Sequence, residues 1–436
     1  MQILKNICFR FQNGVKEIFY EKKKRFIFIV AVLFFCLKPF QYIYYLILPE
    51  NFISKLLFVP VTYLVLFLLI IMLGTPKETF KFSDGFYKIG FYNKAYEIPK
   101  FLNKKRPSKK TDIIIYSFYS PYFALSDWEN MQGRIETLLG RDIVKIEFAK
   151  GNKRNINIYT RNLNNFFSKT LFWNDDYLVR DDKTFILGIS ILGATVSWSL
   201  NMYVNALIAG ATGSGKSAVF RLICYQAIRK GMLVYIASFK GGFDFNITWR
   251  KGCKIITHEK EFLNTLNLIL LEKEKRTELL LAAGCVDIDE YNSESTKKLK
   301  RIFLALDEAA ELLDKDGLKK STDGEKLELL KEIEQKLTSL SRTGRAFGIH
   351  MVFATQKPSA TIINGQIKSN LEARMCGSSD NILSQMVLDN NCASEMIPSG
   401  SKGVFIDQSR IMFKAINEQI QNIAQKKDTL CRRMYN

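Results

Sequence analysis

Apolar positions crowd into the first 75 residues of the chain, where they form two long runs. The first run covers roughly residues 26–48 and contains Lys38, and the second covers roughly residues 52–74 and has few charges. A run of about 20 apolar residues is long enough to cross the hydrocarbon core of a bilayer as a helix. The pattern predicts a two-helix transmembrane hairpin at 26–75, with a signal peptide as the alternative interpretation of the first run.

Basic residues flank both ends of this predicted hairpin. Lys22-Lys23-Lys24-Arg25 precede the first run, and a lysine-rich stretch follows the second. Because Lys and Arg resist translocation, both flanks are predicted to be cytoplasmic. We therefore expect a basic cytoplasmic N-terminus at 1–25, a basic juxtamembrane segment at 76–111, and a multi-pass protein of a bacterial cell membrane whose remaining mass lies in the cytoplasm.

A small module is predicted after the juxtamembrane segment. Alternating apolar residues predict a strand at 112–116, and further strands are predicted at 143–148 and 156–159. Between them, Ser126 and Asp127 can cap a helix that glycine ends at position 140. The pieces predict an α+β module at residues 112–170.

A glycine-rich segment then lies between a short apolar run at 206–209 and a helical pattern at 218–228. It matches the phosphate-binding pattern G-x-x-x-x-G-K-[ST], which requires a strand before it and a helix after it. Backbone N–H groups at the start of such a helix attract phosphate. Lys216 would contact the β- and γ-phosphates of ATP, and Ser217 would bind Mg²⁺. The predicted nucleotide-binding residues are Gly210, Ala211, Thr212, Gly213, Ser214, Gly215, Lys216 and Ser217.

Two adjacent carboxylates follow another apolar run, at 301–306. Such a strand end supplies the metal ligand and the base that a phosphate-binding loop needs for hydrolysis. Asp307 would hold Mg²⁺ through water, and Glu308 would deprotonate the attacking water. The alternative is an acidic pair that merely caps a helix.

A third strand, predicted at 350–355, ends in Gln356, whose amide could contact both the γ-phosphate and the catalytic water. Further apolar runs at 232–237 and 403–406 bring the strands to at least five, alternating with helices. This alternation predicts an α/β P-loop NTPase fold with a mostly parallel, doubly wound sheet. The predicted boundaries are 171–415 for the ATPase motor and 416–436 for a C-terminal tail.

Charge and cysteine usage narrow the setting. The formal charge is +20 and the isoelectric point is about 9.4, which favours a polyanionic partner, either nucleic acid or an anionic membrane surface. A generally basic proteome is the alternative explanation. The eight cysteines contain no Cys-x-x-Cys pair and there are only two histidines, so neither a disulfide framework nor a zinc site is indicated.

The amino-acid sequence beyond the phosphate loop resembles that of the FtsK/SpoIIIE family of DNA translocases. The resemblance is carried by Leu-Ser-Arg-Thr-Gly-Arg-Ala-Phe-Gly-Ile-His at 340–350, Ala-Thr-Gln-Lys-Pro-Ser at 354–359, Ile-Lys-Ser-Asn at 367–370, and Arg374. It covers about residues 112–410. It implies a RecA-like motor that assembles into a homo-hexamer and drives duplex DNA through a central pore, largely without reading sequence.

Within that family the chain is most similar to the compact TcpA-like coupling proteins of Gram-positive conjugative elements, because it has two predicted spans and no long linker. That similarity implies ATP-driven delivery of DNA to a conjugative channel, with a relaxase and channel proteins as partners. The strand-end segment Ser238-Phe239-Lys240 lacks the Asp that family members often place two residues before the lysine, so the role of this position stays open.

The resemblance also implies an arginine that acts across a subunit boundary to stabilise transition-state charge. Arg345 is the first candidate, Arg374 the second and Arg342 the third. A plain salt bridge is an equally good interpretation of each.

Three other functions are compatible with these motifs. One is a chromosome-partitioning DNA pump of the same family, and another is a protein-export ATPase of the type VII kind. Proteins of the latter kind usually carry several ATPase modules, whereas one phosphate loop occurs here. The third is a nucleotide-binding scaffold without catalysis, against which Lys216, Asp307 and Glu308 argue.

Overall fold

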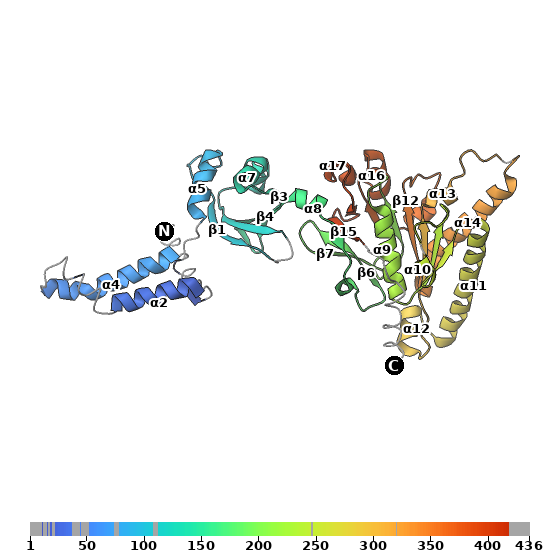
Figure 1. Ribbon diagram of the computed structural model, residues 1–436, viewed down its shortest axis with the longest axis horizontal. Helices are drawn as coiled ribbons and strands as arrows, with labels where there is room; N and C mark the ends of the chain where they lie inside the picture. The colour runs from blue at the N-terminus through green and yellow to red at the C-terminus, as the bar shows by residue number, and fades with distance from the viewer. Residues whose placement is uncertain are drawn as a thin grey trace. The chain divides into compact units, whose positions relative to one another are not determined.

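The computed structural model describes residues 11, 15, 18, 19, 22–36, 44, 52–73, 78–107, 112–245, 247–319 and 321–417. Contacts divide the chain into two compact units, Met1–Asn162 and Leu163–Asn436. Each unit has an apolar core of its own. Figure 1 labels the helices and strands of both.

Two helices begin the first unit. Helix α2 spans Lys22–Cys36 and helix α4 spans Phe52–Leu73. Across the residues that the structure describes, no helix combines the length and apolarity needed to cross a membrane. The two-helix hairpin predicted at 26–75 is thus not supported there. Most of the predicted N-terminal segment 1–25 lies outside the described residues.

The rest of the first unit is built on a four-stranded antiparallel sheet in the described residues, ordered β1-β2-β4-β3. Alternation along β4 turns Ile156 and Ile158 toward an apolar core that also contains Phe86 and Trp128 from the helices. The bounds are α5 Thr79–Lys88, β1 Lys100–Lys105, β2 Ile114–Tyr119, α6 Leu125–Asn130, α7 Gln132–Leu139, β3 Asp142–Ala149 and β4 Asn152–Arg161.

The three predicted strands of this module are confirmed. The predicted helix is divided at Met131 into α6 and α7, and α7 ends at Gly140, which takes a φ of 64° as expected for a glycine stop. Folded structure also begins before the predicted start at residue 112. The segment 76–111, predicted as juxtamembrane, contributes α5 to the core and β1 to the sheet edge.

The second unit contains an 11-stranded sheet in the described residues, with strand order β10-β9-β11-β12-β8-β13-β14-β15-β6-β7 and β5 beside β15. Its strands are β5 Leu171–Phe172, β6 Thr184–Ser190, β7 Thr195–Ser199, β8 Ala206–Ala209, β9 Leu233–Ser238, β10 Lys254–Ile256, β11 Ile302–Asp307, β12 Ile349–Thr355, β13 Ala373–Cys376, β14 Val404–Asp407 and β15 Met412–Asn417.

Helices cover both faces of this sheet. Successive residues of β8 enter two different cores: Leu207 packs in the core with helices α11 and α14, and Ile208 packs in the core with α9 (Figure 1). The helices are α8 Leu163–Ser168, η1 Asp175–Tyr177, α9 Lys216–Arg229, α10 Ile247–Arg250, α11 Glu259–Ala283, α12 Ile288–Glu294, α13 Ala309–Leu313, α14 Gly324–Thr343, η2 Arg345–Phe347, α15 Gly365–Ser369, α16 Asn381–Leu388 and α17 Cys392–Met396.

The sheet is mixed: most of its strand pairs are parallel, as predicted, and the others are antiparallel. Strands β10, β9, β11, β12, β8 and β13 run parallel, whereas β14, β15, β6 and β7 pair antiparallel. Apolar periodicity indicates a strand but not the direction in which its neighbour runs, so the antiparallel pairs could not be predicted from it. The predicted tail 416–436 lies outside the described residues except for Ile416 and Asn417, which end β15.

Candidate functional site

The phosphate loop joins β8 to α9, as predicted. Helix α9 begins at Lys216, and the loop residues Ala211 to Gly213 are exposed. Gly215 takes a φ of 97° at the turn into the helix, and a Cβ there would lie 2.8 Å from the backbone nitrogen of Gly403. Only glycine fits both constraints. The loop is therefore tightly held at its base and open at its tip.

Hydrogen bonds inside the loop modify one expectation. Ser214 is among the predicted nucleotide-binding residues, but its N–H donates to the carbonyl of Ala211 at 3.1 Å. The Ser214 carbonyl accepts from the Gly403 N–H at 2.7 Å. The first turn of α9 still leaves N–H groups without intrahelical partners, and the helix dipole favours an anion there.

Strand β11 delivers the two predicted carboxylates to the same edge of the sheet. Asp307 is its last residue, and Glu308 follows in a left-handed conformation with φ 60°. Both side chains are buried. A left-handed non-glycine residue costs free energy and persists where its surroundings hold it. Here the Glu308 carboxylate is held on both oxygens.

Glu308 is the centre of the site. Its Oε2 lies 2.6 Å from Nζ of Lys216, and its Oε1 accepts from the Thr355 hydroxyl and the Gln356 N–H, both at 2.9 Å. Burial lowers the pKa of the Lys216 ammonium below its ordinary value, although the Glu308 carboxylate opposes that effect. Burial alone would raise the pKa of Glu308, but the bonds from Lys216 and Gln356 outweigh it and lower that pKa.

Asp307 lies beside this pair in a different environment. Burial raises the pKa of its carboxyl above the usual value, and the nearby charge of Asp244 adds to the effect. The Ser238 hydroxyl donates to its Oδ2 at 3.4 Å. Among the residues described, no group of three or more His, Cys, Asp or Glu side chains could hold a metal ion by itself.

Gln356 connects the phosphate loop to Glu308. Its side-chain oxygen accepts from the Thr212 hydroxyl at 2.7 Å, while its backbone N–H donates to Glu308. The structure therefore brings the predicted residues Lys216, Glu308 and Gln356 together. A movement of Gln356 would therefore change its contacts with both Thr212 of the phosphate loop and the Glu308 carboxylate.

The first two of the three candidate arginines, Arg345 and Arg374, make their contacts outside this site. Arg345 precedes β12, at the opposite end of that strand from Gln356, and Arg374 pairs in register with Leu207 of β8. The exposed Arg345 donates to the carbonyl of Asn201 at 2.9 Å. Arg374 forms an ion pair with Asp389 at 2.7 Å and donates to the carbonyl of Leu371 at 3.1 Å. The guanidinium groups of both arginines thus contact residues outside the phosphate loop of their own chain.

Sequence reasoning assigned no role to Thr355 or Lys240, and both face Glu308. Thr355 donates to Oε1, and the Lys240 ammonium lies 3.7 Å from Oε2. Parallel neighbours that end at one edge place the residues after them side by side. Ser238 of β9 lies opposite Asp307 of β11 in the sheet, which places Lys240 beside the acidic pair. This neighbourhood depends on the order of the strands, which the sequence does not reveal.

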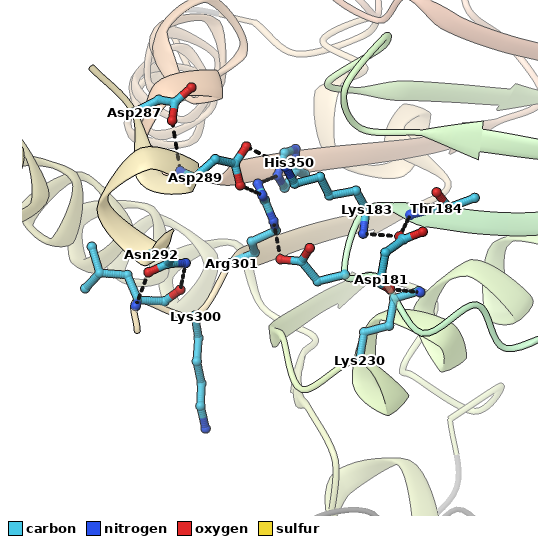
Figure 2. Close-up of polar contacts among 12 residues, drawn as sticks. Asp181, Lys183, Thr184, Lys230, Asp287, Asp289, Asn292, Lys300, Arg301 and His350 are labelled. Atoms are coloured by element: carbon cyan, nitrogen blue, oxygen red, sulfur yellow. Dashed lines mark hydrogen bonds and ion pairs between the residues drawn. The ribbon is translucent and has the colours of Figure 1, made fainter. Parts of the chain in front are cut away.

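A second polar cluster lies at the other edge of the sheet, where β11 and β12 begin. Figure 2 shows Arg301 at its centre. Its Nε donates to Asp182 at 2.8 Å, Nη2 contacts Asp289, and Nη1 lies 3.3 Å from Nε2 of His350. Lys183 adds an ion pair to Asp289 at 2.8 Å. The cluster joins α12 and the segment before β6 to the strands.

His350 is buried within this cluster, and its burial predicts a pH dependence. Burial and then the charge of Arg301 lower its pKa to about 3. In the unfolded chain the imidazole of His350 takes up a proton near its ordinary pKa of 6.5, whereas in the folded chain it stays neutral until about pH 3. The contribution of His350 to stability is therefore fully present above about pH 6.5 and is lost as the pH falls toward 3. Between pH 7 and pH 5 the expected loss is about 2 kcal/mol.

Urea unfolding of the full chain at pH 7 and pH 5 measures this loss. His350→Gln should remove it, whereas His258→Gln should retain it, because the only other histidine of the sequence is exposed. Equal pH dependence in wild type and His350→Gln would refute the assignment.

The fold and the site define a class. A glycine-rich loop between a buried strand and a helix, with Lys216 paired to a carboxylate from a neighbouring parallel strand, is the phosphate site of a P-loop NTPase. The match to a family model is more specific: residues 179–360 match the FtsK/SpoIIIE family. This match confirms the resemblance and supports the predicted ATPase class.

Relatives and one solved structure agree with this assignment. The chain is 27% identical over 255 residues to the DNA translocase FtsK of Leptospira interrogans, covering 54% of this chain and 25% of that protein. It is 31% identical over 236 residues to the FtsK of Treponema pallidum, covering 49% and 27%. The chain thus spans about a quarter of the length of these relatives.

The pCW3 conjugation coupling protein TcpA, solved in its monomer form with ATPγS, is 29% identical, with a TM-score of 0.59. The similarity covers 82% of this chain and 100% of that chain. It therefore extends beyond the matched family domain.

Proposed function

We propose that this chain is a motor that hydrolyses ATP at the loop Gly210–Ser217 and uses the energy to move DNA. The observation that carries the proposal is the junction on Glu308, where the phosphate-loop lysine Lys216 and the amide of Gln356 meet one buried carboxylate. The FtsK/SpoIIIE match and the likeness to TcpA support the same function.

The geometry suggests how each side chain acts. Lys216 leaves Glu308 for the β- and γ-phosphates, where its charge offsets the charge that develops on them. Thr355 and Gln356 continue to orient Glu308, whose carboxylate would take a proton from water. The Gln356 side chain is placed to report the state of the loop through Thr212.

Ser217 and Asp307 are the proposed protein ligands of Mg²⁺. This ion usually takes one or two protein ligands in nucleotide sites, with phosphates and water completing its shell. The absence of a larger ligand cluster in the described residues fits that requirement. When bound, the ion would neutralise phosphate charge.

The proposed assembly is a homo-hexamer in which Arg345 reaches the phosphates of a neighbouring chain. Its exposed position away from its own loop supports it over Arg374, which Asp389 holds. Mixing Arg345→Ala with Lys216→Ala chains tests this: each is expected to be inactive alone, and the mixture should recover hydrolysis because an intact loop then meets an intact arginine. A mixture as inactive as its components would exclude Arg345.

The proposed biological role is that of a conjugative coupling protein, supported by the likeness to TcpA over all of that chain. DNA would be gripped by charge, largely without regard to sequence, and passed from a relaxase to channel proteins. Residues 26–75 would hold the chain at the bacterial cell membrane with the ATPase in the cytoplasm. Deleting the gene should abolish conjugative transfer, and normal transfer would refute the coupling role. The chain should also fractionate with membranes, and its recovery in the soluble fraction would refute the membrane attachment.

Phosphate release with three additions tests the motor function. Duplex DNA is expected to stimulate hydrolysis by the full chain, and single-stranded DNA provides the comparison for the form that is moved. A secreted peptide substrate provides the comparison for the alternative of a protein-export ATPase. Stimulation by the peptide and not by DNA would overturn the proposal.

A further inference from the structure

Lys240 shares its carboxylate partner with the phosphate-loop lysine. It follows β9 on a loop at the edge of the sheet where Asp307 and Glu308 lie. Its Nζ lies 3.7 Å from Oε2 of Glu308, the oxygen that Nζ of Lys216 contacts at 2.6 Å. Two ammonium groups therefore compete for one buried oxygen.

The two lysines differ in their freedom to move. The side chain of Lys216 is 8% exposed, whereas that of Lys240 is 47% exposed. Lys216 is also the first residue of the long helix α9. Lys240 is followed by Gly241 and Gly242, with φ values of 83° and 69°. Successive glycines allow the backbone to change conformation at little cost. The loop at Lys240 is thus better suited to adjust than the start of α9.

Nucleotide binding would change the balance between these lysines. Phosphates attract the loop lysine, and its departure would leave the Glu308 carboxylate, 4% exposed, without its nearest cation. A buried charge without a partner is strongly unfavourable. Lys240 would need to move only roughly 1 Å to reach the usual distance of a charged hydrogen bond.

We propose that Lys240 replaces Lys216 as the cation bound to Glu308 when a nucleotide occupies the phosphate loop. Lys240 is then a positioning residue that keeps Glu308 oriented for hydrolysis. The inference rests on the proposed ATP hydrolysis and adds a residue to it. It also gives a role to Lys240, the last residue of the segment Ser238-Phe239-Lys240.

The loop beyond Lys240 provides a way to observe the exchange. Phe243 is 92% exposed at its tip, and Phe245 is buried against Trp249 with ring centroids 5.2 Å apart. We expect the movement of Lys240 toward Glu308 to shift this segment, on which Phe245 contacts Trp249. The fluorescence of Trp249 should therefore respond to nucleotide.

Kinetics provide the first test. Lys240→Met is expected to lower kcat for ATP at least about tenfold with KM changed less than about twofold, because orientation of the base is lost while binding remains. Lys240→Arg should restore most of the rate, since a guanidinium still pairs with a carboxylate. Lys260→Met, at an exposed lysine in the first turn of α11, is the matched control. Unchanged kcat in Lys240→Met would overturn the proposal.

A double-variant cycle separates positioning from general damage. If Lys240 acts through Glu308, Lys240→Met should have no further effect on hydrolysis in a Glu308→Gln background. A full additional loss in that background would overturn the assignment.

Fluorescence gives a readout that does not depend on turnover. Saturating ATPγS should change the emission of the wild-type chain, and Trp249→Phe should remove the change, which assigns it among the four tryptophans. Lys240→Met should also remove it while calorimetry still detects ATPγS binding. The same change in Lys240→Met, or no change in the saturated wild type, would refute the proposal. If the wild type binds ATPγS but does not hydrolyse ATP, the proposed function fails while this comparison still decides the role of Lys240.

Discussion

Replacement of Lys216 with alanine is expected to lower ATP hydrolysis by about 10²- to 10³-fold, because one preorganised cation is lost where transition-state charge develops. The structure places this ammonium at the start of α9, in a buried position where charge interactions are strong. Phosphate release at saturating ATP measures the effect. Lys260→Met should retain wild-type activity.

The same substitution removes the nearest partner of a buried carboxylate. We therefore expect a loss of stability without nucleotide, which Lys240 reduces because it lies 3.7 Å from the same oxygen. Urea unfolding of the variant separates this loss from the kinetic one. Hydrolysis within a few-fold of wild type in folded Lys216→Ala would contradict the assigned phosphate site.

Glu308→Gln is expected to lower hydrolysis by about 10²- to 10⁴-fold while nucleotide still binds. Glutamine keeps the shape of the side chain and an oxygen to accept from Thr355 and Gln356, but it cannot take a proton from water. Single-turnover hydrolysis and ATPγS calorimetry measure the two properties separately. Turnover near the wild-type rate would show that another group is the base, and lost binding would indicate a structural role.

Much of this site could be predicted from the sequence because its parts are local. The phosphate loop is one continuous segment, and Asp307 with Glu308 directly follows a buried apolar strand. Gln356 likewise ends its own strand. Each part was recognisable by the residues around it.

What could not be predicted depends on contacts distant in sequence. The pairing of Lys216 with Glu308 joins residues 92 positions apart, and that of Arg301 with Asp182 joins residues 119 apart. The approach of Lys240 to the same carboxylate follows from β9 and β11 being neighbours, which only the strand order reveals. The antiparallel part of the sheet was missed for the same reason, since β13 pairs with β14 and β15 with β6.

The lysine-rich composition of residues 76–111 also led to a wrong prediction. Strand β1 and helix α5 lie in a lysine-rich stretch that was interpreted as juxtamembrane, although Phe82, Phe86 and Phe101 from them enter the core of the first unit. Tertiary packing of these few aromatic side chains outweighs the polar composition around them.

Displacement of a triplex-forming strand from duplex DNA tests most directly whether ATP hydrolysis at Gly210–Ser217 moves DNA. The full chain should displace the third strand with ATP, and should fail to do so with ATPγS, as Lys216→Ala or as Glu308→Gln. Displacement that is equal with ATP and with ATPγS, or hydrolysis stimulated by DNA without any displacement, would contradict the proposed movement of DNA by ATP hydrolysis.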